Sequence, residues 1–180
     1  GSVRYNYKNN VVQYRYNDNL LAFSPHQLDH FRFYDADFKT ERLFIVHELP
    51  NRNGYASPVF MEVLVWGELP VLGVLKSQDL KVLKDFREQG ASSPFASSPY
   101  AKVVNYDYYV LAEEHLVQMN DFKQKILPLM QAHKEKLRNY ISENRLRYYK
   151  HLDCLLIIGF HNRLQEALNR NKSQPEAAAQ

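Results

Sequence analysis

The longest apolar stretch in the chain runs from Val59 to Leu75 and has the sequence VFMEVLVWGELPVLGVL. Its β-branched residues alternate with other residues, which is typical of strands with at least one buried face. The segment from Trp66 to Pro70 interrupts the stretch with turn-forming glycine and proline. The pattern therefore predicts two strands joined as a hairpin, and we expect this hairpin to be the centre of a β-sheet.

Residues 3–34 alternate apolar and polar positions with a period of two, and tyrosine supplies many of the apolar ones. Two short segments, Lys8 to Asn10 and Asn17 to Asn19, separate the alternating runs. Their asparagine and aspartate residues tolerate the left-handed backbone that tight hairpin turns require. The pattern predicts an antiparallel meander in which aromatic side chains pair across strands, each pair stabilising the sheet by ~0.2–1 kcal/mol.

More strand-like segments follow the meander and the central hairpin. Aromatic and β-branched residues predict strands over 42–49, 102–111 and 115–119. Ser77 to Glu88 mixes charged and apolar residues, and its pattern leaves open a short helix or an excursion of the sheet. Gly90 to Pro99 (GASSPFASSP) is rich in small residues and interrupted by proline, so we predict a mobile loop there.

After residue 119 the spacing of apolar residues changes to that of helices. Asn120 to Asp121 contains residue types that cap helix N-termini, and we predict a first short helix from there, bent or stopped by Pro128. Two more helices are predicted over 133–144 and 148–169. The segment CLLIIGF (154–160) is apolar on all sides, which predicts burial between the sheet and a neighbouring helix.

Together these elements predict an α+β fold. We expect a strongly curved antiparallel sheet within residues 1–119, with two or three helices of a segment over 120–170 packed on it as one structural unit. Whether the sheet closes into a barrel is left open by the pattern. Residues 171–180 are polar and alanine-rich, and we predict a disordered tail.

Composition narrows the class of protein. With 180 residues and 45% apolar content, the chain can bury a core as one domain without a disulfide. Its single cysteine, Cys154, excludes an intrachain disulfide and a cysteine-based zinc site. The net charge of +3 permits polyanion binding but does not argue for it. No stretch reaches the roughly 18–20 consecutive apolar residues of a membrane helix, so we predict no transmembrane segment.

The N-terminus carries a further hint about location. Gly1-Ser2 looks like the remnant of a cleaved expression tag, and strand-like sequence begins directly at Val3 without a methionine. We therefore expect that the natural N-terminus has been trimmed. Such trimming removes a secretory signal, although it would also remove a disordered leader or a lipidation site.

The order of the elements resembles a family of small, usually secreted Bacteroidetes proteins of unknown function. The likeness lies in five parts of the chain: Val3 to Tyr5 followed by Val11 to Tyr14, Pro25 to Phe33, Val59 to Val65 followed by Val71 to Leu75, Tyr108-Tyr109, and a closing helix that ends near Phe160 to Leu164. The resemblance implies an α+β build and a periplasmic or cell-envelope location, with cytoplasmic location as the alternative. It implies no catalytic residues, and the loop GASSPFASSP departs from the family pattern.

Two histidines offer a candidate metal site. His26 and His30 flank Asp29, and imidazole and carboxylate are common metal ligands. Because the surrounding residues predict a turn into a strand, the two histidines lie about 13 Å apart by the rise per residue. That separation favours surface positions, and we predict no metal and no other cofactor.

The chain carries no catalytic signature. Its six glycines are dispersed, so no phosphate-binding loop exists, and no serine lies in a G-x-S-x-G elbow. The acid pairs Glu113-Glu114 and Asp35 with Asp37 fall at predicted turns, where carboxylates are ordinarily solvated. These observations favour a non-enzymatic protein. A glycosidase-like pair can nevertheless come from any two places in a chain, so an enzyme acting on an envelope polymer is the alternative.

One basic and aromatic cluster stands at the junction of the last two predicted helices. Arginine and lysine at a helix junction commonly cover the surface while tyrosines pack beneath them, but the same residue types can bind a polyanion. A polyanion-binding module is therefore a third hypothesis, although the modest net charge makes nucleic acid an unfavoured partner. The candidate contact residues are Arg145, Arg147, Tyr148, Tyr149 and Lys150.

The thirteen tyrosines suggest the leading hypothesis. Rigid amphipathic rings on a sheet face suit carbohydrate stacking and protein contact, although they also suit packing within the sheet itself. We therefore predict an envelope-associated binding or structural module for a protein or glycan partner, acting through an exposed sheet face or edge.

Overall fold

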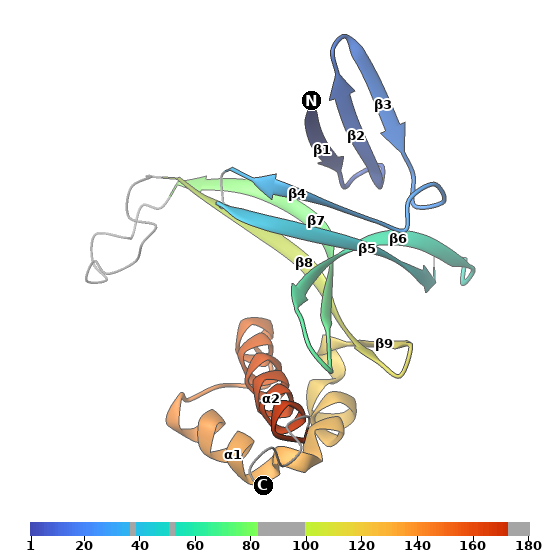
Figure 1. The fold of residues 1–180 in the computed structure, drawn as a ribbon. Coiled ribbons are helices and arrows are strands. Elements are labelled where there is room, and N and C mark those ends of the chain that lie inside the picture. The colour runs from blue at the N-terminus through green and yellow to red at the C-terminus, as the bar shows by residue number, and fades with distance from the viewer. Residues whose placement is uncertain (37–38, 51–52, 83–99, 173–180) are drawn as a thin grey trace, which may run out of the picture.

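The computed structural model describes residues 1–36, 39–50, 53–82 and 100–172 and has the predicted α+β fold (Figure 1). The strands come first along the chain: β1 (Ser2–Asn6), β2 (Val11–Tyr16), β3 (Asn19–Phe23), β4 (His30–Asp35), β5 (Thr40–Pro50), β6 (Ala56–Val65), β7 (Val71–Val82), β8 (Tyr100–Ala112) and β9 (His115–Gln118). The helical segments follow: η1 (Met119–Asp121), η2 (Phe122–Ile126), η3 (Leu127–His133), α1 (Lys134–Glu143) and α2 (His151–Lys172).

The strands form two antiparallel sheets in place of the single sheet predicted over residues 3–119. The small sheet has the order β1-β2-β3, and the large sheet has the order β4-β5-β6-β7-β8-β9. The division comes after Phe23, because a turn follows in which Gln27 donates its backbone N–H to Ser24 O and the next strand pairs with β5. The large sheet is strongly curved but does not close into a barrel (Figure 1).

The predicted central hairpin is confirmed as β6 and β7. Glu62 pairs with Gly73 and Val63 with Leu72, and a bulge follows before the turn. Both strands carry fully buried residues, among them Met61 and Leu72. A Cβ at Gly73 would lie only 2.7 Å from Tyr106 of β8, so this position needs glycine for the tyrosine ring to lie across it.

Aromatic side chains fill the space between the two sheets. Val12 of β2, Phe44 of β5 and Phe60 of β6 are buried there. Phe31 lies directly opposite Phe44 in the register, and their rings stack at 4.7 Å between centroids. The predicted cross-strand aromatic pairing is therefore confirmed here. Tyr5 of β1 joins the cluster, and burial together with the Glu62 carboxylate raises its pKa to about 12.

The segment predicted as a first short helix is irregular. It consists of short 3-10 and π turns, with a kink at Met130, where φ is −100°. The predicted N-cap at Asn120 to Asp121 is wrong, since no side-chain cap hydrogen bond forms at the start of η1 or η2. The Asp121 carboxylate is paired instead with Lys125, 2.7 Å away on the next turn. The second and third predicted helices correspond to α1 and α2.

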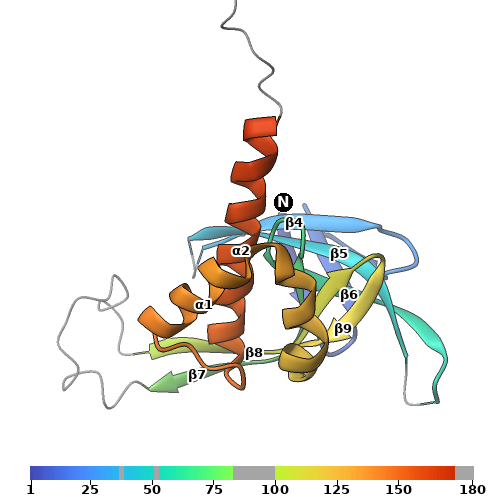
Figure 2. The same cartoon turned by 90° about the horizontal axis from the view of Figure 1, so that it is seen from below.

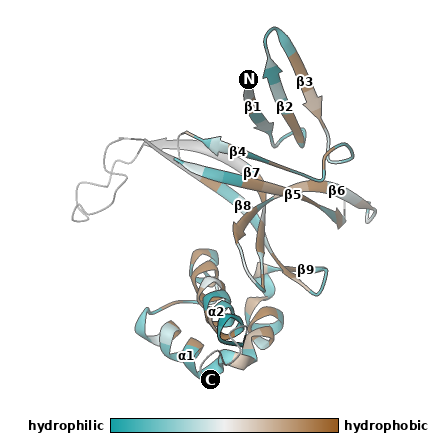
Figure 3. Cartoon of the chain, viewed as in Figure 1, coloured by the Kyte–Doolittle hydropathy of each residue, from teal (hydrophilic) through white to brown (hydrophobic). Residues whose placement is uncertain are grey.

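The helices lie together on one side of the large sheet (Figure 2). Helices and sheet share one core, to which the β6–β7 turn contributes Leu69 and the sheet contributes Val71 and Val110. The helical segments supply its other buried residues: Met119, Phe122, Ile126, Met130, Leu137, Cys154, Ile157 and Ile158. Complete burial of CLLIIGF was predicted wrongly, because Leu156 is 51% exposed on α2. Figure 3 accordingly shows hydrophobic and hydrophilic positions mixed along the helices.

Some predictions fall partly or wholly outside the described residues. The segment from Ser77 begins as an excursion of the sheet, because β7 continues to Val82, whereas residues 83–88 and the loop Gly90 to Pro99 lie outside the described part. Helix α2 continues to Lys172, and residues 173–180 of the predicted tail are likewise not described. Among the described residues, no helix combines the length and the apolarity that crossing a membrane requires.

Candidate functional site

The turn between β6 and β7 lies unusually close to α2. Gly67 in this turn has a φ of +141°, which only glycine adopts readily. A Cβ at this position would lie 2.5 Å from Cγ of Asn162 on α2, so there is also no space for a side chain. The glycine therefore permits both the shape of the turn and its contact with the helix.

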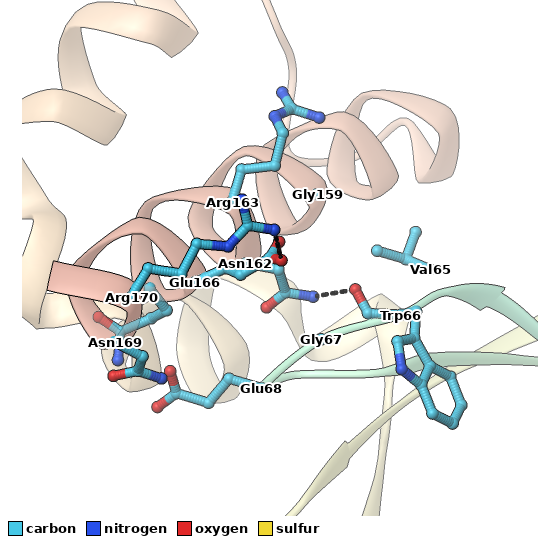
Figure 4. Close-up of a pocket in the computed structure, with 11 residues that line it drawn as sticks. Val65, Trp66, Gly67, Glu68, Gly159, Asn162, Arg163, Glu166, Asn169 and Arg170 are labelled. Carbon is cyan, nitrogen blue, oxygen red and sulfur yellow. Dashed lines mark hydrogen bonds and ion pairs between the residues drawn. The ribbon is translucent and has the colours of Figure 1, made fainter. Parts of the chain in front are cut away.

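Asn162 fastens the turn to the helix with its side-chain amide. The backbone N–H of Leu69 donates to Asn162 Oδ1 at 3.1 Å, and Asn162 Nδ2 donates to the carbonyl oxygens of Leu69 at 3.0 Å and Trp66 at 3.1 Å. Asn162 is buried, so these bonds satisfy polar groups that water does not reach freely. The position of Trp66 is therefore set by one side chain of α2 (Figure 4).

A broad hollow of about 1130 Å³ lies where the turn meets the C-terminal half of α2. We call it the Trp66 hollow, because the indole of Trp66 is 71% exposed at this place. Most of the other lining side chains are polar (Figure 4). The lining residues are Val65, Trp66, Gly67, Glu68, Gly159, Asn162, Arg163, Gln165, Glu166, Asn169 and Arg170.

The charged groups of the hollow differ in how they are paired. Arg170 forms an ion pair with Glu166 one turn earlier on α2. The guanidinium of Arg163 lies 5.8 Å from the ring centroid of Phe160, and within the described part of the chain it forms no ion pair. Glu68 likewise has no ion pair or hydrogen bond with any described residue. One cation and one carboxylate are thus available to a ligand.

The residue before Asn162 on α2 is a buried histidine. His161 is 2% exposed, and neither of its ring nitrogens has a hydrogen-bond partner among the described residues. Its ring lies 5.4 Å from that of His133, whose Nε2 is 2.6 Å from Gln165 Oε1. Burial lowers the pKa of His161, Glu68 opposes this effect, and His133 adds to it. Burial of the ring therefore favours its neutral form.

The basic cluster predicted from sequence is divided between several surroundings. Arg145, with a φ of 53°, follows the end of α1 and is exposed. Arg147 donates its backbone N–H to Asp153 Oδ2 at 2.9 Å, and its guanidinium donates to the hydroxyl of Tyr149 at 2.7 Å. Tyr148 instead packs on Phe122, with 5.7 Å between ring centroids.

Lys150 lies apart from Tyr148, in a second hollow of about 430 Å³ beside β8. This hollow is lined by Asn105, Tyr106, Tyr108, Lys150, His151, Leu152 and Asp153. Of the candidate polyanion contacts, the structure pairs the side chains of Arg147 and Tyr149, and binding by the cluster stays a prediction.

Two carboxylates do converge, but on an arginine inside the large sheet. Arg42 contacts Asp35 at 2.9 Å and both oxygens of Glu62 at 2.8 and 2.6 Å, and all three side chains are buried. The hydroxyl of Tyr106 donates to Glu62 at 2.5 Å, and burial followed by the Glu62 charge raises the pKa of this tyrosine. The guanidinium contacts both carboxylates, so the arrangement resembles a structural network more than an acid and base pair.

The candidate metal ligands are not brought together. His26 and His30 are both exposed, in the turn before β4 and at its first residue. Within the residues that the structure describes, no three side chains of histidine, cysteine, aspartate or glutamate are placed to share a metal ion.

The residues that build the Trp66 hollow were not identified from sequence as a site. Trp66 is the single tryptophan of the chain and lies in a predicted turn, which is a usable signal. Asn162 is a polar residue close behind the apolar run of α2, but its partners lie more than ninety positions earlier in the chain. No family model, no curated protein and no solved structure matches this chain.

Proposed function

We propose that the protein is a non-enzymatic binding module of the cell envelope and that the Trp66 hollow holds a glycan. The observation that carries the proposal is Trp66, which is largely exposed on the turn that lines the hollow. Tryptophan is favoured where an apolar ring meets a wet surface. A sugar ring has the matching chemistry, because C–H groups cover its faces and hydroxyl groups surround its edge.

The polar side chains of the hollow supply both kinds of hydrogen-bonding group. The Glu68 carboxylate accepts hydrogen bonds from hydroxyl groups, and the Arg163 guanidinium donates to hydroxyl or acidic oxygens. The volume of about 1130 Å³ exceeds the roughly 300–1,000 Å³ of ordinary small-molecule pockets. The hollow therefore suits a stretch of several sugar units better than a single one.

The envelope part of the proposal rests on the resemblance to secreted Bacteroidetes proteins. Polymers of the envelope are the glycans that such a protein would meet. Cytoplasmic location is the alternative. Comparing the native protein in periplasmic and cytoplasmic fractions of its source would decide between the two.

A protein partner is the second candidate, and a different surface favours it. Tyr149, just before α2, and Leu152 and Leu156 in its N-terminal half are exposed, although all three are large hydrophobic residues. Exposed apolar patches of this kind often mark protein contacts. The two candidates use different residues, so one set of variants separates them.

The single tryptophan gives a direct test by intrinsic fluorescence. We would titrate the protein with chitohexaose, cellohexaose and a soluble peptidoglycan digest, and confirm any emission change by calorimetry. Trp66→Ala is expected to weaken glycan binding at least tenfold, about 1.4 kcal/mol, without lowering the melting temperature. Tyr34→Ala removes another exposed aromatic side chain, on β4, and is the matched control.

The outcomes separate the hypotheses. If no glycan of the panel binds, or if Trp66→Ala binds as tightly as the original protein, the glycan proposal is rejected. New reducing ends in the glycan after incubation would support the alternative of an enzyme. Loss of binding to an envelope protein in Leu156→Ser, with Trp66→Ala unaffected, would support the protein partner.

A further inference from the structure

The helical region contains a cavity that the proposed glycan site does not use. It has a volume of about 230 Å³ and lies between η3, α1 and Tyr148. We call it the α1 cavity. Its lining residues are Leu127, Met130, Gln131, Lys134, Leu137, Arg138, Ile141 and Tyr148. Met130 and Leu137 are buried, whereas Leu127, Ile141 and Tyr148 are half-buried, so the interior is apolar.

The polar members of the lining are exposed, and the charged ones share one sign. Lys134 and Arg138 are four positions apart and lie on the same face of α1 as Leu137 and Ile141. Neither cation forms an ion pair with a described residue, and the lining includes no acidic side chain. The third polar member, Gln131, is neutral. The cavity therefore combines an apolar interior with two cations that an anion would complement.

We propose that the α1 cavity binds a free medium-chain fatty acid. The acyl chain lies over Met130 and Leu137, and the carboxylate accepts hydrogen bonds from Lys134 and Arg138. A water occupies roughly 30 Å³ of liquid, and a methylene group is of similar size, so 230 Å³ holds about seven or eight such groups. This corresponds to a chain of roughly eight to ten carbons when the head group lies outside.

The charge of the head group separates this ligand from apolar molecules in general. An alcohol of the same chain length fills the cavity equally well but gives the two cations no charge to pair with. A phospholipid has two acyl chains and a larger head group, which exceed the volume. The inference is therefore specific for one acyl chain with one anionic head.

The first experiment is a calorimetric titration with hexanoate, octanoate, decanoate and tetradecanoate, each below its critical micelle concentration. Affinity should rise about fourfold per added methylene up to roughly ten carbons and then level off. Decanol should bind at least tenfold more weakly than decanoate. Vesicles of phosphatidylglycerol should not bind the protein in a sedimentation assay.

A pair of double variants tests the charged rim. Lys134→Gln/Arg138→Gln should weaken decanoate binding at least tenfold and leave the melting temperature of the free protein unchanged, because both side chains are exposed. Lys123→Gln/Lys136→Gln removes the same charge from exposed positions that do not line the cavity and should bind decanoate normally. Chemical shifts in amide spectra should change at Leu137 and Ile141 on addition of decanoate.

Four kinds of result would overturn the proposal. The first is absence of decanoate binding at millimolar concentration. The second is equal affinity for decanoate and decanol, or equal loss of affinity in both double variants, which would indicate a general apolar or charge effect. The third is a set of shift changes confined to other parts of the protein. Binding of vesicles without binding of free acids would also contradict it.

Discussion

The two ends of the large sheet are covered in different ways. At the end formed by β4 to β6, the small sheet packs on aromatic rings, and Arg42 pairs with two carboxylates among them. At the end formed by β7 to β9, the helices cover the sheet with mainly aliphatic side chains, together with the buried polar residues Asn162 and His161.

The difference lies in what the buried polar groups bind. The charged groups around Arg42 bind one another and the hydroxyl of Tyr106, so the network is satisfied within the protein. Asn162 instead uses its amide to hold the backbone of a turn, and the Trp66 hollow stays open beside it. Comparison of the two ends thus separates a polar network that is closed within the sheet from one that holds the turn of the proposed glycan site.

The largest expected effect is at the aromatic end. Arg42→Met removes the guanidinium that contacts both buried carboxylates, Asp35 and Glu62, which should lower the free energy of unfolding by about 3–5 kcal/mol. Urea denaturation of the variant measures this loss. Asp35→Asn and Glu62→Gln added to the same variant should restore part of the stability, because no unpaired charge is then buried. If Arg42→Met alone has a free energy of unfolding within about 1 kcal/mol of that of the original protein, the role assigned to Arg42 is contradicted.

A smaller effect is expected at the helical end. Asn162→Ala removes hydrogen bonds to three backbone groups of the turn and should lower the free energy of unfolding by about 1–3 kcal/mol. It should also weaken glycan binding, since the turn carries Trp66. Asn139→Ala removes the same amide from an exposed position on α1 and should change stability by less than about 0.5 kcal/mol. If both variants unfold with the same free energy, the hydrogen bonds of Asn162 do not stabilise the folded protein.

Local patterns predicted the elements of this fold better than their assembly. Period-two alternation identified the strands, and the Trp66 to Pro70 segment identified the central turn, because both signals lie in neighbouring residues. The separation of β3 from β4 depends on which strand pairs with which, and a meander pattern is the same for one sheet or two. Exposure of Leu156 likewise depends on which elements cover α2, which the apolar run does not show.

The candidate site was harder to predict for the same reason. Trp66 and Asn162 are far apart in sequence, and each alone resembles an ordinary turn or helix residue. The basic cluster was a candidate site because its residues are adjacent in the sequence. In the structure, however, Tyr148 packs on Phe122, whereas Lys150 lines the hollow beside β8. Residues that are adjacent in the sequence therefore do not have to form one site on the surface.

The smallest expected effect is a pH dependence of stability at the helical end, where His161 is buried. Burial lowers the pKa of His161 below the ordinary value of 6.5, so the unfolded chain binds a proton at a higher pH than the folded protein does. The contribution of His161 to stability is therefore present above pH 6.5 and falls as the pH drops below this value towards the folded pKa. His161→Leu should lose less stability than the original protein between pH 7.5 and 5, measured as the change in melting temperature. His26→Gln, at an exposed position, should follow the original protein, and parallel curves for all three would mean that His161 does not control the pH dependence of this end.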